Sequence, residues 1–320
     1  MQESIQNFND QFNFEPEIKN ESNLRPAENF VVGGMGGSHL AAGILKSIDE
    51  RLNIRIHRDY DLPFTKEDRK QNTLFIASSF SGNTEETVSF LENALKENLN
   101  VAVITKGGRL LEIAEQNNLP FIKLPDSDIQ PRVALGWSLL AISKFVKPDL
   151  VPALKELSRT LNPLQWHDSG EELAEEFKGK IPLIYASRQN RELARIWKIK
   201  FNETAKIPAF FNIFPELNHN EMTGFDHNSE NKNLSENFFF VFLKDSDDHP
   251  RIQKRMKITA ELFEERGLKI KIVELDGEDR LQKIFGSILL GDWTALRTAG
   301  IYNSEPDQVP MVEKFKKMIN

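Results

Sequence analysis

The chain has 320 residues, of which 39% are hydrophobic and 28% charged, so it can bury a sizeable core and fits two domains better than one. Its 48 acidic residues outnumber 41 lysines and arginines, and the net charge of -7 argues against a nucleic acid as the main partner. The sequence has no cysteine, which excludes disulfides, thiolate metal sites and cysteine nucleophiles.

The first 14 residues are polar and acidic and lack the apolar core of a signal peptide, and no run of about eighteen apolar residues follows. We therefore expect a cytoplasmic protein without a membrane partner. Residues 1–27 as a whole are rich in Asn, Gln and Glu. They predict a leader that packs on the first domain.

Short apolar runs then alternate with amphipathic stretches. The run at 29–33 lacks polar alternation, which is typical of a strand covered on both faces, and residues 38–52 repeat apolar side chains at helical spacing. This pair is one βα unit. The other elements expected in this half are strands at residues 53–57, 73–77, 101–105 and 121–124 and helices at residues 84–99, 110–116 and 133–146.

The same alternation of apolar runs and amphipathic stretches begins again after a helical crossover at residues 148–173. We therefore predict two doubly wound α/β domains, residues 28–150 and 151–320, each with a parallel sheet between two helix layers, and a C-terminal helix. Ligands of such sheets bind at the carboxyl ends of the strands. The elements expected in the second half are strands at residues 181–187, 238–244 and 269–275 and helices at residues 192–206, 251–266, 279–299 and 309–319.

A glycine-rich turn, Gly-Gly-Met-Gly-Gly-Ser at residues 33–38, follows the first strand. Glycine permits positive φ and close backbone approach, and a helix start presents free N–H groups to an anion. One alternative is a dinucleotide-binding turn of a nicotinamide-dependent oxidoreductase, but that motif needs a glycine where His39 stands. A purely structural tight turn is the other alternative.

A hydroxyl-rich turn follows the strand at 73–77. Ser79, Ser81 and Thr84 place three hydroxyls beside a helix N-terminus, a set of donors suited to a phosphate monoester without a metal. Capping of that helix by Asn83 or Thr84 is the alternative, although a cap uses only one of these side chains. The predicted phosphate site combines the hydroxyls and backbone donors of both turns: Gly36, Gly37, Ser38, Ser79, Ser81 and Thr84.

These two turns together resemble the sugar isomerase (SIS) domain, a phosphosugar-binding module. Three more segments resemble the bifunctional phosphoglucose/phosphomannose isomerases, which contain two SIS domains: Gln-Pro-Arg at 130–132, the residues from 202 to 221 with their Pro-Glu-Leu-Asn-His-Asn-Glu run, and Asp-Asp-His-Pro-Arg at 247–251. The resemblance extends from residue 31 to residue 316. It implies interconversion of glucose 6-phosphate, and by extension mannose 6-phosphate, with fructose 6-phosphate through a cis-enediol.

That reaction needs a base that moves a proton between C2 and C1, a donor that opens the sugar ring, and a cation beside the enediolate. The resemblance assigns these roles to Glu203, His219 and Arg132, respectively. Each also has a simpler interpretation, as a solvated helix-end acid, a surface histidine and a surface arginine. Residues 308–316 match the family's C-terminal lysine pattern, which points to Lys316, with the neighbouring Lys314 and Lys317 as competing assignments.

The resemblance also implies a homodimer in which His219 is contributed across the interface. Neither a metal nor another cofactor is expected, because six histidines without His-x-His or His-Glu-x-x-His spacing fit a zinc enzyme poorly. Arg297 and Thr298 depart from the family pattern and leave the preference between glucose and mannose open. A non-catalytic phosphosugar sensor built on the same two domains is the alternative function.

Overall fold

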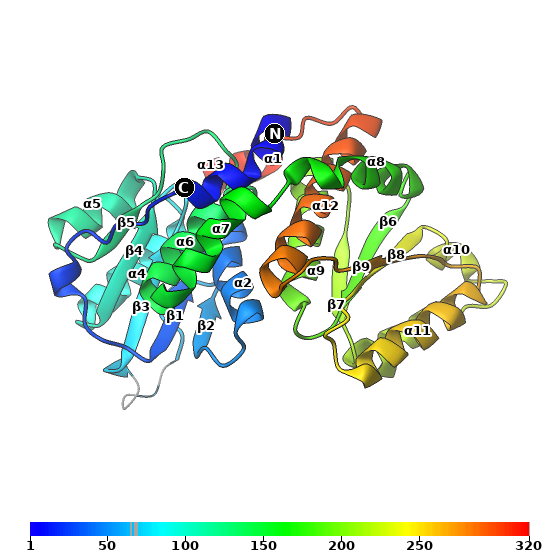
Figure 1. Cartoon of the computed structure of the whole chain (residues 1–320), viewed down its shortest axis with the longest axis horizontal. Helices are drawn as coiled ribbons and strands as arrows, with labels where there is room; N and C mark the ends of the chain where they lie inside the picture. Colours follow the sequence, from blue (N-terminus) through cyan, green and yellow to red (C-terminus); the bar gives the residue numbers. More distant parts are fainter. Residues whose placement is uncertain (65, 67–69, 320) are drawn as a thin grey trace. The chain divides into compact units, whose positions relative to one another are not determined.

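The computed structural model describes residues 1–64, 66 and 70–319, which form two compact units (Figure 1). The N-terminal unit is Asn7–Asn162, and the C-terminal unit combines Met1–Gln6 with Pro163–Asn320. Each unit contains one parallel sheet, as the apolar runs predicted. Among the described residues, no helix is both long and apolar enough to cross a membrane.

The sheet of the N-terminal unit has the strand order β2-β1-β3-β4-β5, and every neighbouring pair is parallel. Every residue of β3 and β4 is buried, as expected for strands covered on both faces. The strands are β1 (Asn29–Gly33), β2 (Ile54–His57), β3 (Thr73–Ser78), β4 (Asn100–Thr105) and β5 (Phe121–Lys123).

Helices cover both faces of this sheet: α2 packs with α6, and α4 packs with α5 (Figure 1). Their apolar faces follow the helical spacing of the sequence, and in the core Phe75 of β3 contacts Phe90 of α4 with ring centroids 6.2 Å apart. The helices are α2 (Leu40–Ile48), α4 (Glu85–Lys96), α5 (Gly108–Gln116), α6 (Leu135–Val146) and α7 (Val151–Thr160).

The boundary between the units differs from the expected one at residue 150. Helix α7 packs against the 3-10 segment η1 (Phe8–Asn13), and the Asn9 side-chain amide donates to the carbonyl of Ser158 over 3.0 Å. The leader is also divided, because Ile5 is buried in the C-terminal unit and the Met1 amino group lies 3.1 Å from the Asp307 carboxylate. The residues from Asn7 onward belong to the N-terminal unit.

The sheet of the C-terminal unit has the order β7-β6-β8-β9, again with parallel pairs only. Its core is aromatic, and Tyr185 contacts the rings of Phe214, Phe240 and Phe242. The strands are β6 (Ile181–Ala186), β7 (Phe210–Ile213), β8 (Phe238–Lys244) and β9 (Lys269–Glu274). Strand β7 is not predicted from the sequence, since it has only four residues, stands at the sheet edge and keeps Phe210 exposed.

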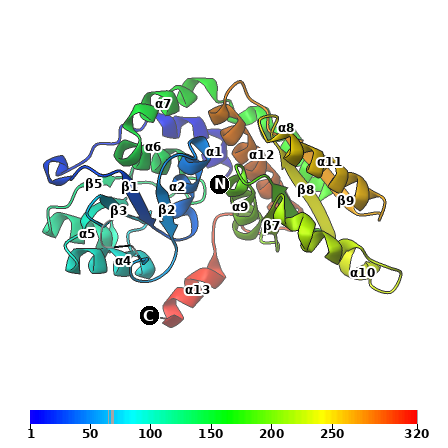
Figure 2. The ribbon, with the colours of Figure 1, turned by 90° about the horizontal axis from the view of Figure 1, so that it is seen from below.

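Helix α12 packs on α8 and α9, while α11 packs on β8 and β9 (Figure 2). The helix expected at 192–206 is shorter than predicted: α9 ends at Lys200 and a π-helical turn, η6 (Phe201–Ala205), follows. The helices are α1 (Gln2–Gln6), α8 (His167–Glu176), α9 (Arg191–Lys200), α10 (Lys232–Ser235), α11 (Pro250–Glu264), α12 (Arg280–Ile301) and α13 (Pro310–Ile319).

Candidate active site

The order of the first sheet reverses between β1 and β3, so the loops after these strands leave toward opposite faces. Open α/β sheets bind ligands at such a point, beyond the carboxyl ends of the strands. The glycine-rich turn follows β1 and the hydroxyl-rich turn follows β3. The two predicted halves of the phosphate site therefore lie side by side in the N-terminal unit.

The glycine-rich turn contains two glycines with different requirements. Gly36 has a φ of +51°, which favours glycine, and a Cβ there would meet nothing within 4 Å. A Cβ on Gly37 would lie 2.7 Å from the carbonyl carbon of Pro131 and 2.8 Å from the nitrogen of Arg132. The missing side chain of Gly37 thus lets the segment that carries Arg132 lie against the turn.

Ser38 links the glycine-rich turn to the hydroxyl-rich turn. Its hydroxyl accepts a hydrogen bond from the Phe80 backbone N–H over 3.0 Å, and its carbonyl accepts one from the Ser78 hydroxyl over 3.1 Å. These bonds join the ends of β1 and β3. They hold the two turns in a fixed relation.

In the hydroxyl-rich turn, the side-chain oxygens of Ser79 and Thr84 lie 2.8 Å apart. Only one of the two hydroxyl hydrogens is needed for this bond, so the other can donate to an oxyanion. The buried Ser79 oxygen also accepts from the N–H of Gly82 over 3.2 Å, while Ser81 is exposed. The turn therefore presents hydroxyls at the start of α4, where the helix dipole favours an anion.

The capping alternative for these side chains is wrong. Thr84 occupies the N-cap position of α4 but its side chain makes no capping hydrogen bond. Asn83 instead accepts from the backbone N–H of Arg109 over 2.9 Å, so it caps the neighbouring helix α5. This role depends on a residue distant in sequence, and no local pattern could have shown it.

Arg132 lies in the turn before α6, and the surface-arginine interpretation is wrong because the side chain is only 1% exposed. Its guanidinium lies 3.5 Å from the Gln130 side-chain oxygen. His39 is buried as well, with its Nε2 3.4 Å from the guanidinium of Arg58. A buried guanidinium keeps its charge, and this charge favours an anionic ligand beside the glycine-rich turn.

The C-terminal unit carries the other predicted residues on three separate segments. Glu203 is half-buried on the π-helical turn η6, and its carbonyl accepts a hydrogen bond from Lys206. Such turns within helices often mark functional sites. The turn begins directly after Lys200, which forms a buried ion pair with Asp292 of α12. This pair, which is not predicted from the sequence, fixes the base of the turn that presents Glu203.

His219 is exposed at the end of the 3-10 segment η7 (Glu216–His219), and its neighbours anchor the segment. Asn218 donates to the Thr259 hydroxyl over 2.8 Å, and Glu221 accepts from the Tyr185 hydroxyl over 2.5 Å and from the Asn212 amide. Burial, and then the bond to Glu221, raises the pKa of Tyr185, which stays protonated as a donor. Anchors on both sides leave the imidazole projecting from a fixed loop.

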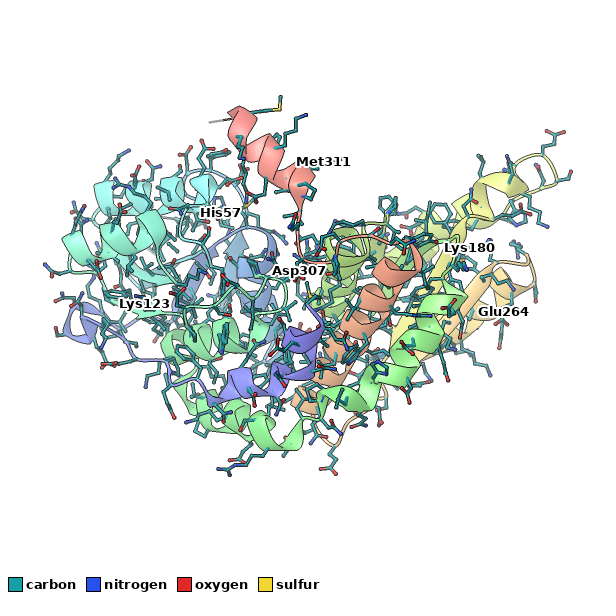
Figure 3. The ribbon with its side chains drawn as sticks, turned by 90° about the horizontal axis from the view of Figure 1, so that it is seen from above. His57, Lys123, Lys180, Glu264, Asp307 and Met311 are labelled. Carbon is teal, nitrogen blue, oxygen red and sulfur yellow. The ribbon has the colours of Figure 1, made fainter. Side chains whose placement is uncertain are left out.

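Lys316 lies on α13, none of whose residues is buried, and its ammonium is 2.8 Å from the Glu313 carboxylate. Lys314 and Lys317 are exposed on the same helix, so the choice among the three lysines stays a prediction. Figure 3 labels Met311 on this helix and Asp307 in the segment before it. Within the described part of the chain, no three His, Asp or Glu side chains gather as a metal site would require.

Comparisons with known proteins identify the fold and the family. The family described as the bacterial phospho-glucose isomerase C-terminal SIS domain matches residues 167–319. The C-terminal domain of glucosamine-fructose-6-phosphate aminotransferase from Francisella tularensis has the same fold, with a TM-score of 0.68 and 16% identity over 96% of this chain and 95% of that one.

Two curated relatives carry the same name, bifunctional phosphoglucose/phosphomannose isomerase. The protein from Caldicellulosiruptor bescii is 33% identical over 100% of this chain and 98% of its own length. The protein from Thermoplasma volcanium is 34% identical over 99% of this chain and 98% of its own length. With its tandem SIS-type domains, this chain belongs to the bifunctional phosphoglucose/phosphomannose isomerase family.

Proposed function

We propose that the protein is a phosphosugar isomerase that interconverts glucose 6-phosphate, and also mannose 6-phosphate, with fructose 6-phosphate. The observation that carries this proposal is the meeting of the glycine-rich turn, the hydroxyl-rich turn and buried Arg132 at the carboxyl ends of β1 and β3. Hydroxyls, backbone N–H groups and a guanidinium are the donors that a phosphorylated sugar requires. The names of full-length relatives supply the substrate class.

The phosphate group is assigned to the N-terminal unit. The Ser79 and Thr84 hydroxyls, with Ser81 at the rim, donate to its oxygens, and the backbone near Gly36 and Gly37 approaches without side chains in the way. Ser38 serves by holding the two turns together. Binding energy from this non-reacting end of the substrate positions the carbon atoms that react.

The proton transfer is assigned to Glu203. Its carboxylate removes the proton from C2 of the open aldose while the C1 carbonyl oxygen gains a proton, which gives a cis-enediol. The proton then returns to C1 as the C2 hydroxyl becomes the ketone. Arg132 stabilises the negative charge that develops on the oxygen atoms during these steps.

Ring opening is assigned to His219, with Lys316 assisting. A protonated imidazole can donate a proton to the ring oxygen. Because His219 is exposed and held by anchored neighbours, it is suited to act on a second copy of the chain, and we propose a homodimer in which it does so. The protein is proposed to work in the cytoplasm without a cofactor.

A non-catalytic phosphosugar sensor is not favoured, because the relatives that cover the whole chain are named as isomerases. Incubation with fructose 6-phosphate separates the two functions. NMR should detect both glucose 6-phosphate and mannose 6-phosphate, and the ratio of their initial rates gives the epimer preference. Protein whose melting temperature rises with fructose 6-phosphate but which forms neither product would be a sensor.

A further inference from the structure

The C-terminal unit has a strand reversal of its own, between β6 and β8, and a cluster of charged side chains around the buried Asp245 lies there. The cluster consists of Asp245, Asp247, Asp248, Arg280 and Lys283, with Asn190 beside it. None of these residues has a part in the proposed reaction. The same position in the N-terminal unit is the proposed phosphate site.

The loops after β3 and β8 share a backbone arrangement. Ser79 and Asp245 are each the first residue after their strand. The carbonyl of Ser79 accepts from the N–H of Gly82 over 3.2 Å, and the carbonyl of Asp245 accepts from the N–H of Asp248 over 3.1 Å. Asp245 therefore occupies, in the second sheet, the place that Ser79 occupies in the first.

The Asp245 carboxylate is fully buried and receives four donors. Arg280 donates over 2.7 Å, Lys283 over 2.9 Å, the backbone N–H of Asp247 over 3.0 Å and the Asn190 amide over 3.2 Å. Two cations, an N–H and an amide are the set of donors that would bind a phosphate. Here a side chain of the same chain already uses them.

The remaining carboxyl groups also contact the same donors. Asp248 is buried 3.5 Å from the Asn190 amide, and Lys283 lies 2.6 Å from the Asp247 carboxylate. Burial by itself would raise the pKa of Asp245, but its N–H, Lys283 and Asn190 donors lower that pKa below its ordinary value. Asp245 is thus ionised, and a phosphate would meet a carboxylate that is already paired.

Building on the proposed phosphate site of the N-terminal unit, we propose that Asp245 is an internal ligand at the anion position of the second SIS-type domain. Each chain then binds one phosphosugar rather than two. Removing the Asp245 side chain opens a latent site in which Arg280 and Lys283 bind inorganic phosphate.

The test compares melting temperatures of the full chain in phosphate and in chloride at equal ionic strength. Asp245→Ser installs the residue that stands at the matching place in the first sheet, and in chloride it should lower the melting temperature because Arg280 and Lys283 lose the buried carboxylate that they share. Phosphate should restore roughly half or more of that loss, beyond the rise seen with the unaltered protein. An equal loss in both salts would overturn the proposal.

Two control variants separate the effect of the Asp245 charge from the effect of the space that its side chain occupies. Asp245→Asn removes the charge but still fills the position, so phosphate should restore little of its melting temperature. Asp245→Ser combined with Lys283→Met should lose the phosphate effect, because one of the two cations is gone. If phosphate restores this double variant as well as the single one, the anion binds elsewhere and the proposal fails.

Native mass spectrometry of the unaltered protein tests the same proposal without a variant. Titration with fructose 6-phosphate should saturate at one molecule per chain, and saturation at two would overturn the proposal. The phosphate measurements involve no turnover, so their failure would leave the isomerase function standing. A protein without isomerase activity could conversely still show the phosphate effect at Asp245.

Discussion

Replacement of Gly37 by alanine tests whether close approach of the Arg132 segment to the glycine-rich turn matters for catalysis. The new Cβ would lie 2.7 Å from the Pro131 carbonyl carbon, about 0.7 Å short of the 3.4 Å at which ordinary contact begins. Both neighbouring atoms belong to the backbone, so no side-chain rotation relieves the clash. The Pro131–Arg132 peptide must move away from the turn.

The expected magnitude follows from that displacement. A misplacement of about 1 Å can cost roughly 10²-fold in rate, so a shift of about 0.7 Å should lower kcat/KM by about 10- to 10²-fold. Overpacking of a buried contact costs about 1–3 kcal/mol of stability, which thermal unfolding will report. Steady-state kinetics with fructose 6-phosphate measures the first effect.

Two glycines of the same unit provide matched controls. Gly107→Ala should change neither property, because its backbone is extended and its Cβ would meet nothing within 4 Å. Gly36→Ala is a control for stability only, because the backbone near Gly36 is assigned to the phosphate: it has the same open space but a φ of +51°, so it should cost about 1–2 kcal/mol of strain without a clash. Gly37→Ala enzyme with unchanged kcat/KM would refute the role given to this contact.

Three further substitutions address the C-terminal unit. Glu203→Gln should lower kcat by about 10²–10⁴-fold while fructose 6-phosphate still raises the melting temperature, and retained activity in a coupled assay would show that another group is the base. His219→Ala should slow cyclic substrate far more than the ring-opened fraction, and equal losses in stopped-flow traces would argue against ring opening. Lys200→Met should lower the free energy of unfolding by about 3–5 kcal/mol because Asp292 remains buried without its cation, and Asp292→Leu in the same chain should recover most of it in urea titrations.

The strand positions were predictable because strands such as β3 and β4 are short, fully buried apolar runs. Strand β7 was missed because its residues are half-exposed and carry no alternation. The π-helical turn at Phe201–Ala205 was missed because helical spacing continues through it. A sequence pattern indicates that a segment has an apolar face but not what covers it, so the packing of α7 against η1 could not be predicted.

In the candidate site, too, the sequence showed residue types but not their partners. Residue types alone indicated a phosphate site at the two turns, since three hydroxyls beside a helix start are rarely needed for capping. The sequence could not show that Asn83 caps α5, that Ser38 joins the turns, or which glycine needs close approach. Each of these roles depends on a partner that only the folded chain brings near.

The most direct test of the isomerase mechanism is turnover of fructose 6-phosphate in deuterium oxide, followed by NMR of the aldose 6-phosphates formed. Proton transfer through an enediol by Glu203 exchanges with solvent, so a fraction of the product should carry deuterium at C2. Product that carries only protium at C2 would indicate direct hydride transfer and contradict the enediol mechanism.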